Sequence, residues 1–184
     1  MRTTTLFALA SIPLLAVPAC HHSSQPAASP EPARRTTRAT TRTTTVAAPV
    51  KASPEVIAEE LIARTNSERR GAGVPALTRS ANLMRAAEIQ AEQMARANVM
   101  EHDIPGAAYP SLGSRLAHVN YIMRAAGENI GEGYRSPSAA VAGWMASAGH
   151  RANILSPNFT EIGVGMAPGP NGSVYWVQVF GRPR

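Results

Sequence analysis

Two polar stretches lie close together in the second half of this 184-residue chain. The first, GENIGEGY at residues 127–134, places Glu128 between glycines, and the second, WMASAGHRANIL at residues 144–155, sets His150 behind a glycine and next to Arg151. A carboxylate and an imidazole at such positions bind a ligand, cut a substrate or only hold the fold. The residue types alone leave these three alternatives open.

Signatures of hydrolytic enzymes are weak in this sequence. Ser147 precedes His150 by three positions, but no third side chain that would orient such a pair is evident. The chain also has no HExxH, the motif in which one helix carries two zinc-binding histidines and a general base. Any site must therefore be assembled by the fold from residues that are far apart in the sequence.

Three helices are predicted among the elements that must position these residues. In SPEVIAEELIARTNSERRGAG, Ser53 caps the helix, the proline suits its first turn, and the glycines end it. In SANLMRAAEIQAEQMARANVM, Ser80 is the expected cap, and alanines, leucine and methionines form one apolar face. A third helix is predicted from Ser136, its cap, to Ala146.

The C-terminal third changes from helical to β-strand character. Two β-rich runs flank PGPNG, which predicts a hairpin. Alternation in the last run separates two faces: Val174, Trp176, Gln178 and Phe180 lie on one, and Tyr175, Val177 and Val179 on the other. Helices followed by antiparallel strands predict an α+β fold in which helices cover a central antiparallel sheet.

The N-terminus carries an export signal. MRTTTLFALASIPLLAVPAC has one arginine, an apolar run that is too short to span a bilayer, and small residues up to Cys20. VPAC resembles a bacterial lipobox, which predicts a signal peptide over residues 1–19 and lipid attachment at Cys20; a plain signal peptide is the alternative. Because Cys20 is the only cysteine, we expect no disulfide inside the exported domain.

The positive charge of the chain belongs to its N-terminal part. Residues 20–52 are rich in Thr, Arg and Pro and are predicted to be a disordered tether, followed by one domain over residues 53–184. The formal net charge is +6, but from residue 54 onward 12 Arg face 11 Asp and Glu, a net of 12 − 11 = +1. A basic flexible tail favours contact with an anionic surface, and we expect no nucleic-acid partner.

Several segments of the domain, taken in order, resemble the CAP superfamily of cysteine-rich secretory proteins, antigen 5 allergens and plant pathogenesis-related proteins. These segments are RTNSERRGAGVPALTRSANLMRAAEIQAEQMA, EHD, AAGENIGEGY, AVAGWMASAGHRANILSPNFTEIGVGMA and YWVQVFG. The chain is most similar to the disulfide-free bacterial branch with an SCP-like extracellular domain. The resemblance covers residues 56–181 and implies a three-layer α–β–α sandwich with a central cleft.

The resemblance also implies a set of cleft residues. It places the two family histidines at His102 and His150 and the acidic residue at Glu128, a set that binds a divalent metal, here zinc, weakly and with water as a further ligand. Many eukaryotic relatives have another glutamate where this chain has Ser147. The role of general base beside a metal-bound water is then vacant unless Glu132 or Glu161 supplies it.

Each cleft residue also has a structural interpretation. Glu128 alternatively binds backbone amides in a glycine-rich turn, His150 alternatively forms a buried pair with Glu128, and His102 alternatively lies in a solvated loop. The other polar residues of the cleft are expected to support the site or hold the fold: Ser147, Asn129, Arg151 and Asn153. The same structural role is expected of Asn66 and Arg69 on the first helix, and Trp144 and Trp176 are expected in the core.

The function that this combination predicts is a non-enzymatic binding module at the cell envelope, either a lipoprotein or a secreted protein. Its ligand would be a small apolar molecule, a cell-wall component or another protein, in addition to the membrane that holds the lipid anchor. The alternative is a metal-dependent, peptidase-like hydrolase. The binding module is favoured because Ser147 removes one acidic group and no nucleophile–base pair replaces it.

Overall fold

A computed structural model of the protein describes residues 53–184. The predicted signal peptide (1–19), the lipidation site Cys20 and the tether (20–52) lie outside these residues. Within the described part, none of the helices has both the length and the apolar character that crossing a membrane requires.

Serine residues mark the beginning of most helices. The helices are α1 (Pro54–Gly71), α2 (Ala81–Ala97), α3 (Leu112–His118), α4 (Pro137–Ala146) and α5 (Ala148–Ile154). Ser53 and Ser136 accept hydrogen bonds from the backbone N–H groups of Val56 and Ala139, as predicted. Ser80 stands at the predicted N-cap position of α2, although its side chain makes no cap bond. Periodicity does not predict α3 and α5, because seven residues form fewer than two helical turns.

The four strands form one sheet in the order β1-β3-β4-β2. They are β1 (Thr78–Arg79), β2 (Met123–Glu132), β3 (Glu161–Pro168) and β4 (Val174–Pro183). The predicted hairpin is the antiparallel pair β3–β4, and β2 pairs antiparallel with β4. The two-residue β1 runs parallel to β3, so the sheet is mixed, although its three long strands are antiparallel as predicted.

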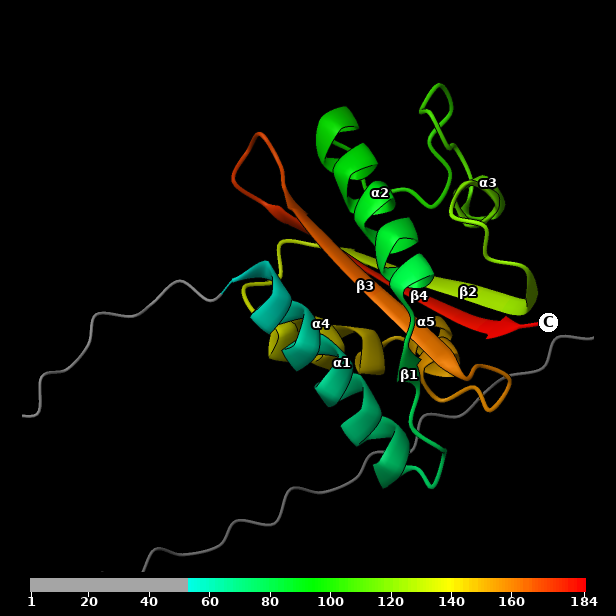
Figure 1. The fold of residues 1–184 in the computed structure, drawn as a ribbon. Helices are drawn as coiled ribbons and strands as arrows, with labels where there is room; N and C mark the ends of the chain where they lie inside the picture. Colours follow the sequence, from blue (N-terminus) through cyan, green and yellow to red (C-terminus); the bar gives the residue numbers. More distant parts are fainter. Residues whose placement is uncertain (1–52) are drawn as a thin grey trace, which may run out of the picture. The chain divides into compact units, whose positions relative to one another are not determined.

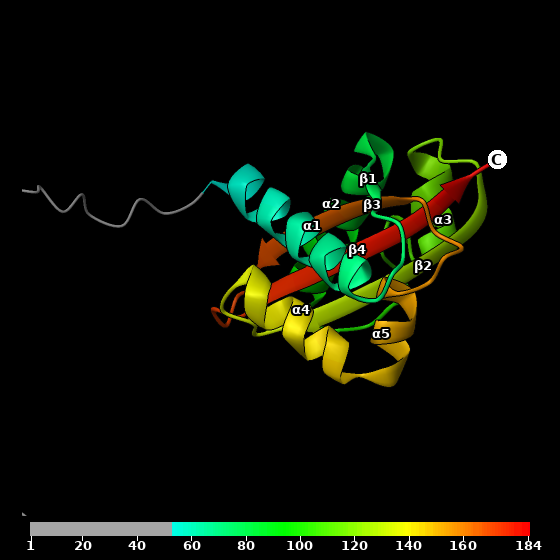
Figure 2. The ribbon, with the colours of Figure 1, turned by 90° about the horizontal axis from the view of Figure 1, so that it is seen from below.

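Helices cover both faces of the sheet and form the three-layer sandwich (Figures 1 and 2). Helices α2 and α3 lie over one face, and α1, α4 and α5 lie on the other side. The alternation predicted for the last strand is confirmed. Trp176 and Phe180 pack in the cluster with α1 and α4, whereas Tyr175, Val177 and Val179 pack under α2. Trp144 and Trp176 are both buried in the core.

Two glycines of β3 allow α2 to approach the sheet closely. A Cβ atom on Gly163 would overlap the backbone of Leu83 and Met84, and one on Gly165 would overlap the backbone of Ala87. In both cases the neighbour is helix backbone, which cannot turn away as a flexible side chain can. The GVG sequence in β3 therefore sets the spacing between α2 and the sheet.

Asn66 and Arg69 of α1 hold loops through backbone hydrogen bonds. Asn66 accepts a bond from the Leu77 N–H at 2.7 Å and donates to the Leu77 carbonyl at 3.0 Å. The buried Arg69 donates to four carbonyl oxygens, including those of Pro75 and Ile154 at 2.8 and 2.7 Å. This confirms the structural role predicted for both residues, and it fixes the segment after α5 against α1.

Candidate functional site

The edge strand β2 carries the central carboxylate of the site. GENIGE lies inside this strand, and Glu128 pairs with Val179 of β4. The alternative in which Glu128 binds amides of a glycine-rich turn does not hold, because its side-chain oxygens bond to His102 and Arg115. Its side chain, only 3% exposed, lies toward α3, where Arg115 Nη2 donates to Glu128 Oε2 at 2.7 Å. Arg115 is completely buried, so this is an ion pair removed from solvent.

The second oxygen of Glu128 accepts a hydrogen bond from His102. The distance from His102 Nδ1 to Glu128 Oε1 is 2.9 Å. Because a carboxylate only accepts hydrogen bonds, Nδ1 carries the proton and Nε2 is left for another partner. This bond raises the pKa of His102 above its ordinary value, and the charge of Glu128 adds to the effect, although partial burial opposes it.

The loop that carries His102 is anchored to α2 and α3. Gln90, fully buried in α2, donates from Nε2 to the carbonyl of Glu101 at 2.7 Å and to that of His102 at 3.2 Å. Arg115 also reaches the His102 carbonyl, at 3.4 Å. The imidazole itself is half exposed, with 55% of its side-chain surface accessible. The structure thus combines a fixed backbone with a side chain that solvent and ligands can reach, and the solvated-loop interpretation is only partly right.

A chain of amide hydrogen bonds fixes α5, the helix that carries His150. Asn129 Nδ2 donates to the His150 carbonyl at 3.1 Å, and Asn153 Nδ2 donates to Asn129 Oδ1 at 2.9 Å. The chain continues into the core, where Asn129 donates to Gln178 at 3.0 Å and Gln178 donates to Thr65 at 2.7 Å. The predicted structural roles of Asn129 and Asn153 agree with these contacts.

His150 does not pair with Glu128. The two oxygens of Glu128 are bonded to His102 and Arg115, so the alternative of a His150–Glu128 pair does not hold. Burial lowers the pKa of His150, and the charge of His102 lowers it further. The surroundings therefore favour the protonated form of His102 and the neutral form of His150.

The remaining predicted residues lie around this centre. Ser147 stands at the junction of α4 and α5, and its side chain caps neither helix. Arg151 is exposed in α5, and within residues 53–184 it forms no salt bridge. The two candidate bases are engaged elsewhere. Glu161 accepts a hydrogen bond from Tyr121 at 2.9 Å, and Glu132 lies beside Tyr175, four residues along β2 from Glu128.

Glu128 is not free to serve as a third protein ligand of a metal ion beside the two histidines. Within the described residues, no three His, Cys, Asp or Glu side chains gather closely enough to hold a metal ion. Both oxygens of Glu128 are already engaged. Histidines that ligate a metal commonly donate their other ring N–H to a carboxylate, as His102 does to Glu128. Through this bond Glu128 orients the His102 ring, and Nε2 is the nitrogen that could ligate a metal ion.

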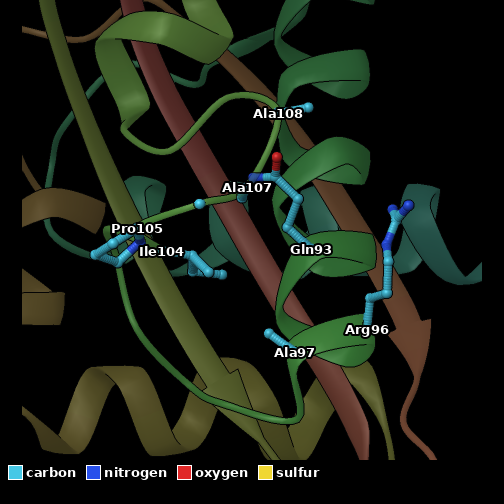
Figure 3. A pocket seen from close by; sticks show the side chains of 8 residues that line it. Gln93, Arg96, Ala97, Ile104, Pro105, Ala107 and Ala108 are labelled. Atoms are coloured by element: carbon cyan, nitrogen blue, oxygen red, sulfur yellow. The ribbon is translucent and has the colours of Figure 1, made fainter.

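An apolar hollow adjoins the loop of His102. Its volume is about 470 Å³, and it lies between the last turns of α2 and residues 104–108 (Figure 3). Most of its lining is apolar, from Ala97, Ile104, Pro105, Ala107 and Ala108. Gln93 and Arg96 of α2 supply the polar rim, and Gln93 is held by hydrogen bonds to both backbone groups of Tyr109.

Sequence reasoning missed Arg115 and Gln90, although both hold the site. Arg115 stands in SRL, and Gln90 stands among the small and charged residues of EIQAEQ. An arginine or glutamine on a helix is usually exposed, and single-sequence patterns give no sign of a buried partner. The only available signal was indirect: both positions lie on the face of their helix that also carries buried apolar residues, such as Leu116 and Ala87.

The three-layer sandwich, with a bonded histidine–carboxylate pair at its edge strand, agrees with a domain of the SCP type. The profile of the cysteine-rich secretory protein family, CAP, matches residues 62–180, and the chain belongs to this family. This confirms the resemblance seen in the sequence.

Relatives in bacteria support the same assignment. The chain is 35% identical over 124 residues to the uncharacterized protein YkwD of Bacillus subtilis (strain 168), which covers 67% of this chain and 47% of YkwD. It is 43% identical over 58 residues to the uncharacterized membrane protein YlbC of the same organism, which covers 32% of this chain and 17% of YlbC. The chain thus spans about half or less of the length of these relatives.

Solved structures share the fold. An extracellular protein containing an SCP domain from Bacillus anthracis str. Ames has a TM-score of 0.63 at 28% identity, covering 71% of this chain and 44% of that protein. An outer surface protein from Borrelia burgdorferi has a TM-score of 0.62 at 16% identity, covering 68% of this chain and 92% of that protein. At that level of identity, the second likeness concerns the fold alone.

Proposed function

We infer that this protein is a non-enzymatic binding module of the cell envelope, whose cleft binds zinc weakly through His102 and His150. The observation that carries the inference is the linked set Arg115–Glu128–His102, which holds one imidazole by its Nδ1–H and leaves its Nε2 for a further partner. Two neutral imidazoles without a ligating carboxylate make a weak site, because the charge of Glu128 is already balanced by Arg115.

Binding is favoured over metal-dependent hydrolysis by the positions of the carboxylates. A hydrolase of this kind needs a general base within hydrogen-bond reach of the metal-bound water. Glu128 is engaged on both oxygens, and Glu161 is bonded to Tyr121. Glu132 is four strand residues from Glu128, a separation of about 13 Å. If zinc is bound, it would hold a ligand group or a water molecule rather than activate one.

The apolar hollow beside the cleft supports a small apolar molecule as the ligand. Ile104, which lines the hollow, follows His102 by two residues, so the hollow adjoins the loop that carries this histidine. A cell-wall component or another protein remains the alternative. A place outside the cell is supported by the export signal and by the extracellular relative, and lipid attachment at Cys20 would hold the protein at the membrane.

Zinc titration by calorimetry tests the cleft. The full chain would carry alanine at His21 and His22 in all samples, so that these adjacent histidines contribute nothing. We expect weak binding in this background, a loss of binding in His150→Ala, and no change in His118→Ala, a control at a histidine that stacks on Tyr109. Ser147→Glu should strengthen binding by adding an anionic oxygen near the metal. Equal binding by all four proteins would contradict the site.

Membrane fractionation tests the location. Wild type is expected in the membrane fraction with a lipid-modified N-terminal residue, and Cys20→Ser is expected in the soluble exported fraction. A wild-type protein that is exported without lipid would show that the plain signal peptide is the correct alternative, and a protein that stays in the cytoplasm would contradict export.

A further inference from the structure

One end of the sheet exposes apolar side chains beside arginines. At this end β2 begins and β4 finishes, near the C-terminus in Figure 1, and Met123 pairs with Pro183. Ile122 is 67% exposed and Met123 is 40% exposed, and Ile122 is the most exposed large apolar residue in the described part of the chain. Two neighbouring apolar side chains in water are less usual than a single one, and such a pair favours an interaction surface.

Two arginines converge next to this apolar pair. A hollow of about 400 Å³ is lined by Arg124, Ala125, Asn158 and Arg182. The register of β2 against β4 shifts between Met123 and Ala125. An irregularity of this kind changes the direction of the side chain at that point, which here is Arg124. The surface made of Ile122, Met123, Arg124, Asn158 and Arg182 is called the strand-end surface below.

The charges of the strand-end surface are not neutralised by the domain. Among residues 53–184, Arg64, Arg79 and Arg85 each form an ion pair with a glutamate, whereas Arg124 and Arg182 form none. The nearest acidic residue along the sheet is Glu161, which lies opposite Gly181 and accepts a hydrogen bond from Tyr121. Two guanidinium groups and the Asn158 amide therefore offer donors to an anion, since arginine matches the geometry of phosphate oxygens.

We propose that the strand-end surface docks on the anionic phospholipid surface of a membrane. Arg124 and Arg182 would meet lipid phosphates, and Ile122 and Met123 would enter the boundary between headgroups and acyl chains. A soluble polyanion would satisfy the arginines but would leave both apolar side chains in water, so the lipid surface explains more of the observations. This contact is separate from the cleft and does not depend on zinc binding or on lipid attachment at Cys20.

Vesicle co-sedimentation of the full chain tests the proposal. All proteins would carry Cys20→Ser, which removes the lipid attachment site, and the basic N-terminal part would be the same in every sample. Vesicles of phosphatidylcholine with phosphatidylglycerol would be compared with phosphatidylcholine alone. We expect Arg124→Gln with Arg182→Gln to lower the partition coefficient on anionic vesicles by roughly fivefold for each arginine.

A matched control separates local docking from overall charge. Arg70→Gln with Arg135→Gln removes the same charge from exposed positions elsewhere and should leave the partition coefficient within about twofold of its starting value, since surface attraction falls off within a Debye length. Equal losses in the two double variants would overturn the proposal, because the attraction would then follow net charge alone.

The apolar pair distinguishes a bilayer from a soluble polyanion. Ile122→Ser with Met123→Ser should reduce binding to anionic vesicles, and the emission of Ile122→Trp should shift to shorter wavelength when these vesicles are added, above the constant signal of the buried Trp144 and Trp176. No reduction and no shift, together with displacement from vesicles by polyphosphate, would overturn the bilayer assignment in favour of a polyanion site.

Discussion

Replacement of Arg115 should be one of the most damaging single changes in the domain. Arg115→Met keeps an apolar stem of similar length and removes the guanidinium, which leaves the carboxylate of Glu128, only 3% exposed, without its counter-charge. Breaking a buried ion pair from one side costs about 3–5 kcal/mol of the free energy of unfolding. Domains of this kind are stabilised by about 5–15 kcal/mol in total, so Arg115→Met should lose a large part of that.

Replacing Arg115 and Glu128 together should lower the free energy of unfolding much less than replacing Arg115 alone. Arg115→Met combined with Glu128→Gln removes both charges, and the amide can still accept the His102 N–H. Because a buried pair contributes little net stability once its desolvation is counted, we expect the double variant to lie within about 2 kcal/mol of wild type. Arg115 Nε already has no hydrogen-bond partner in the described part, so the guanidinium is incompletely satisfied even now.

Urea denaturation followed by circular dichroism measures these free energies. Arg85→Met is the control, because Arg85 forms an exposed pair with Glu88 at 3.4 Å and should cost less than about 1 kcal/mol. If Arg115→Met lowers the free energy of unfolding by less than about 1 kcal/mol, Glu128 does not depend on its buried counter-charge as predicted. A double variant as unstable as the sum of its two single changes would refute the prediction as well, since the two charges would then act independently.

Three further predictions concern the frame around the site. Gly163→Ala should cost about 3 kcal/mol or more of the free energy of unfolding, because its Cβ meets the backbone of α2, whereas Gly149→Ala meets open space and should be nearly neutral by the same urea assay. Gln178→Leu should cost about 1–3 kcal/mol in thermal melts, because it leaves buried amide and hydroxyl partners unsatisfied; a change below a few tenths would contradict the network. Between about pH 5 and 9, the pair of His102 and Glu128 should stabilise fully below about pH 6.5 and lose its contribution as pH rises through the raised pKa of His102. Denaturation curves of Glu128→Gln over this range should lack that loss.

The sequence predicted the elements whose signals are local. Ser53 and Ser136 caps, the long apolar stripes and the PGPNG hairpin each follow from short-range preferences, and the structure contains all of them. The family resemblance then supplied the order of layers. It could not supply the parallel pairing of β1, because two residues carry no periodic signal and their pairing is set by the contact of Thr78 with Glu161.

The sequence predicted which residue types form the site, but it did not predict which of these side chains contact one another. His102 and Glu128 are bonded, yet Glu128 pairs with Arg115 rather than with His150 or with loop amides. These partners come from α3 and β2, and Arg115 and Glu128 are 13 positions apart. The sequence pattern alone does not show whether Arg115 or His150 will contact Glu128 in the folded domain. Such contacts depend on the fold of the edge strand and on the path of the loop that carries His102.

In the proposed function, two imidazoles bind zinc while Glu128, fixed by Arg115, accepts the Nδ1–H of His102. Long-range proton–nitrogen correlation spectra of the imidazoles, recorded with and without zinc, test it most directly. We predict that zinc shifts the Nε2 resonance of His102 and one nitrogen of His150, while the His102 Nδ1–H persists and His118 is unaffected. Loss of the His102 Nδ1–H on zinc binding, or shifts confined to His118, would contradict the claim.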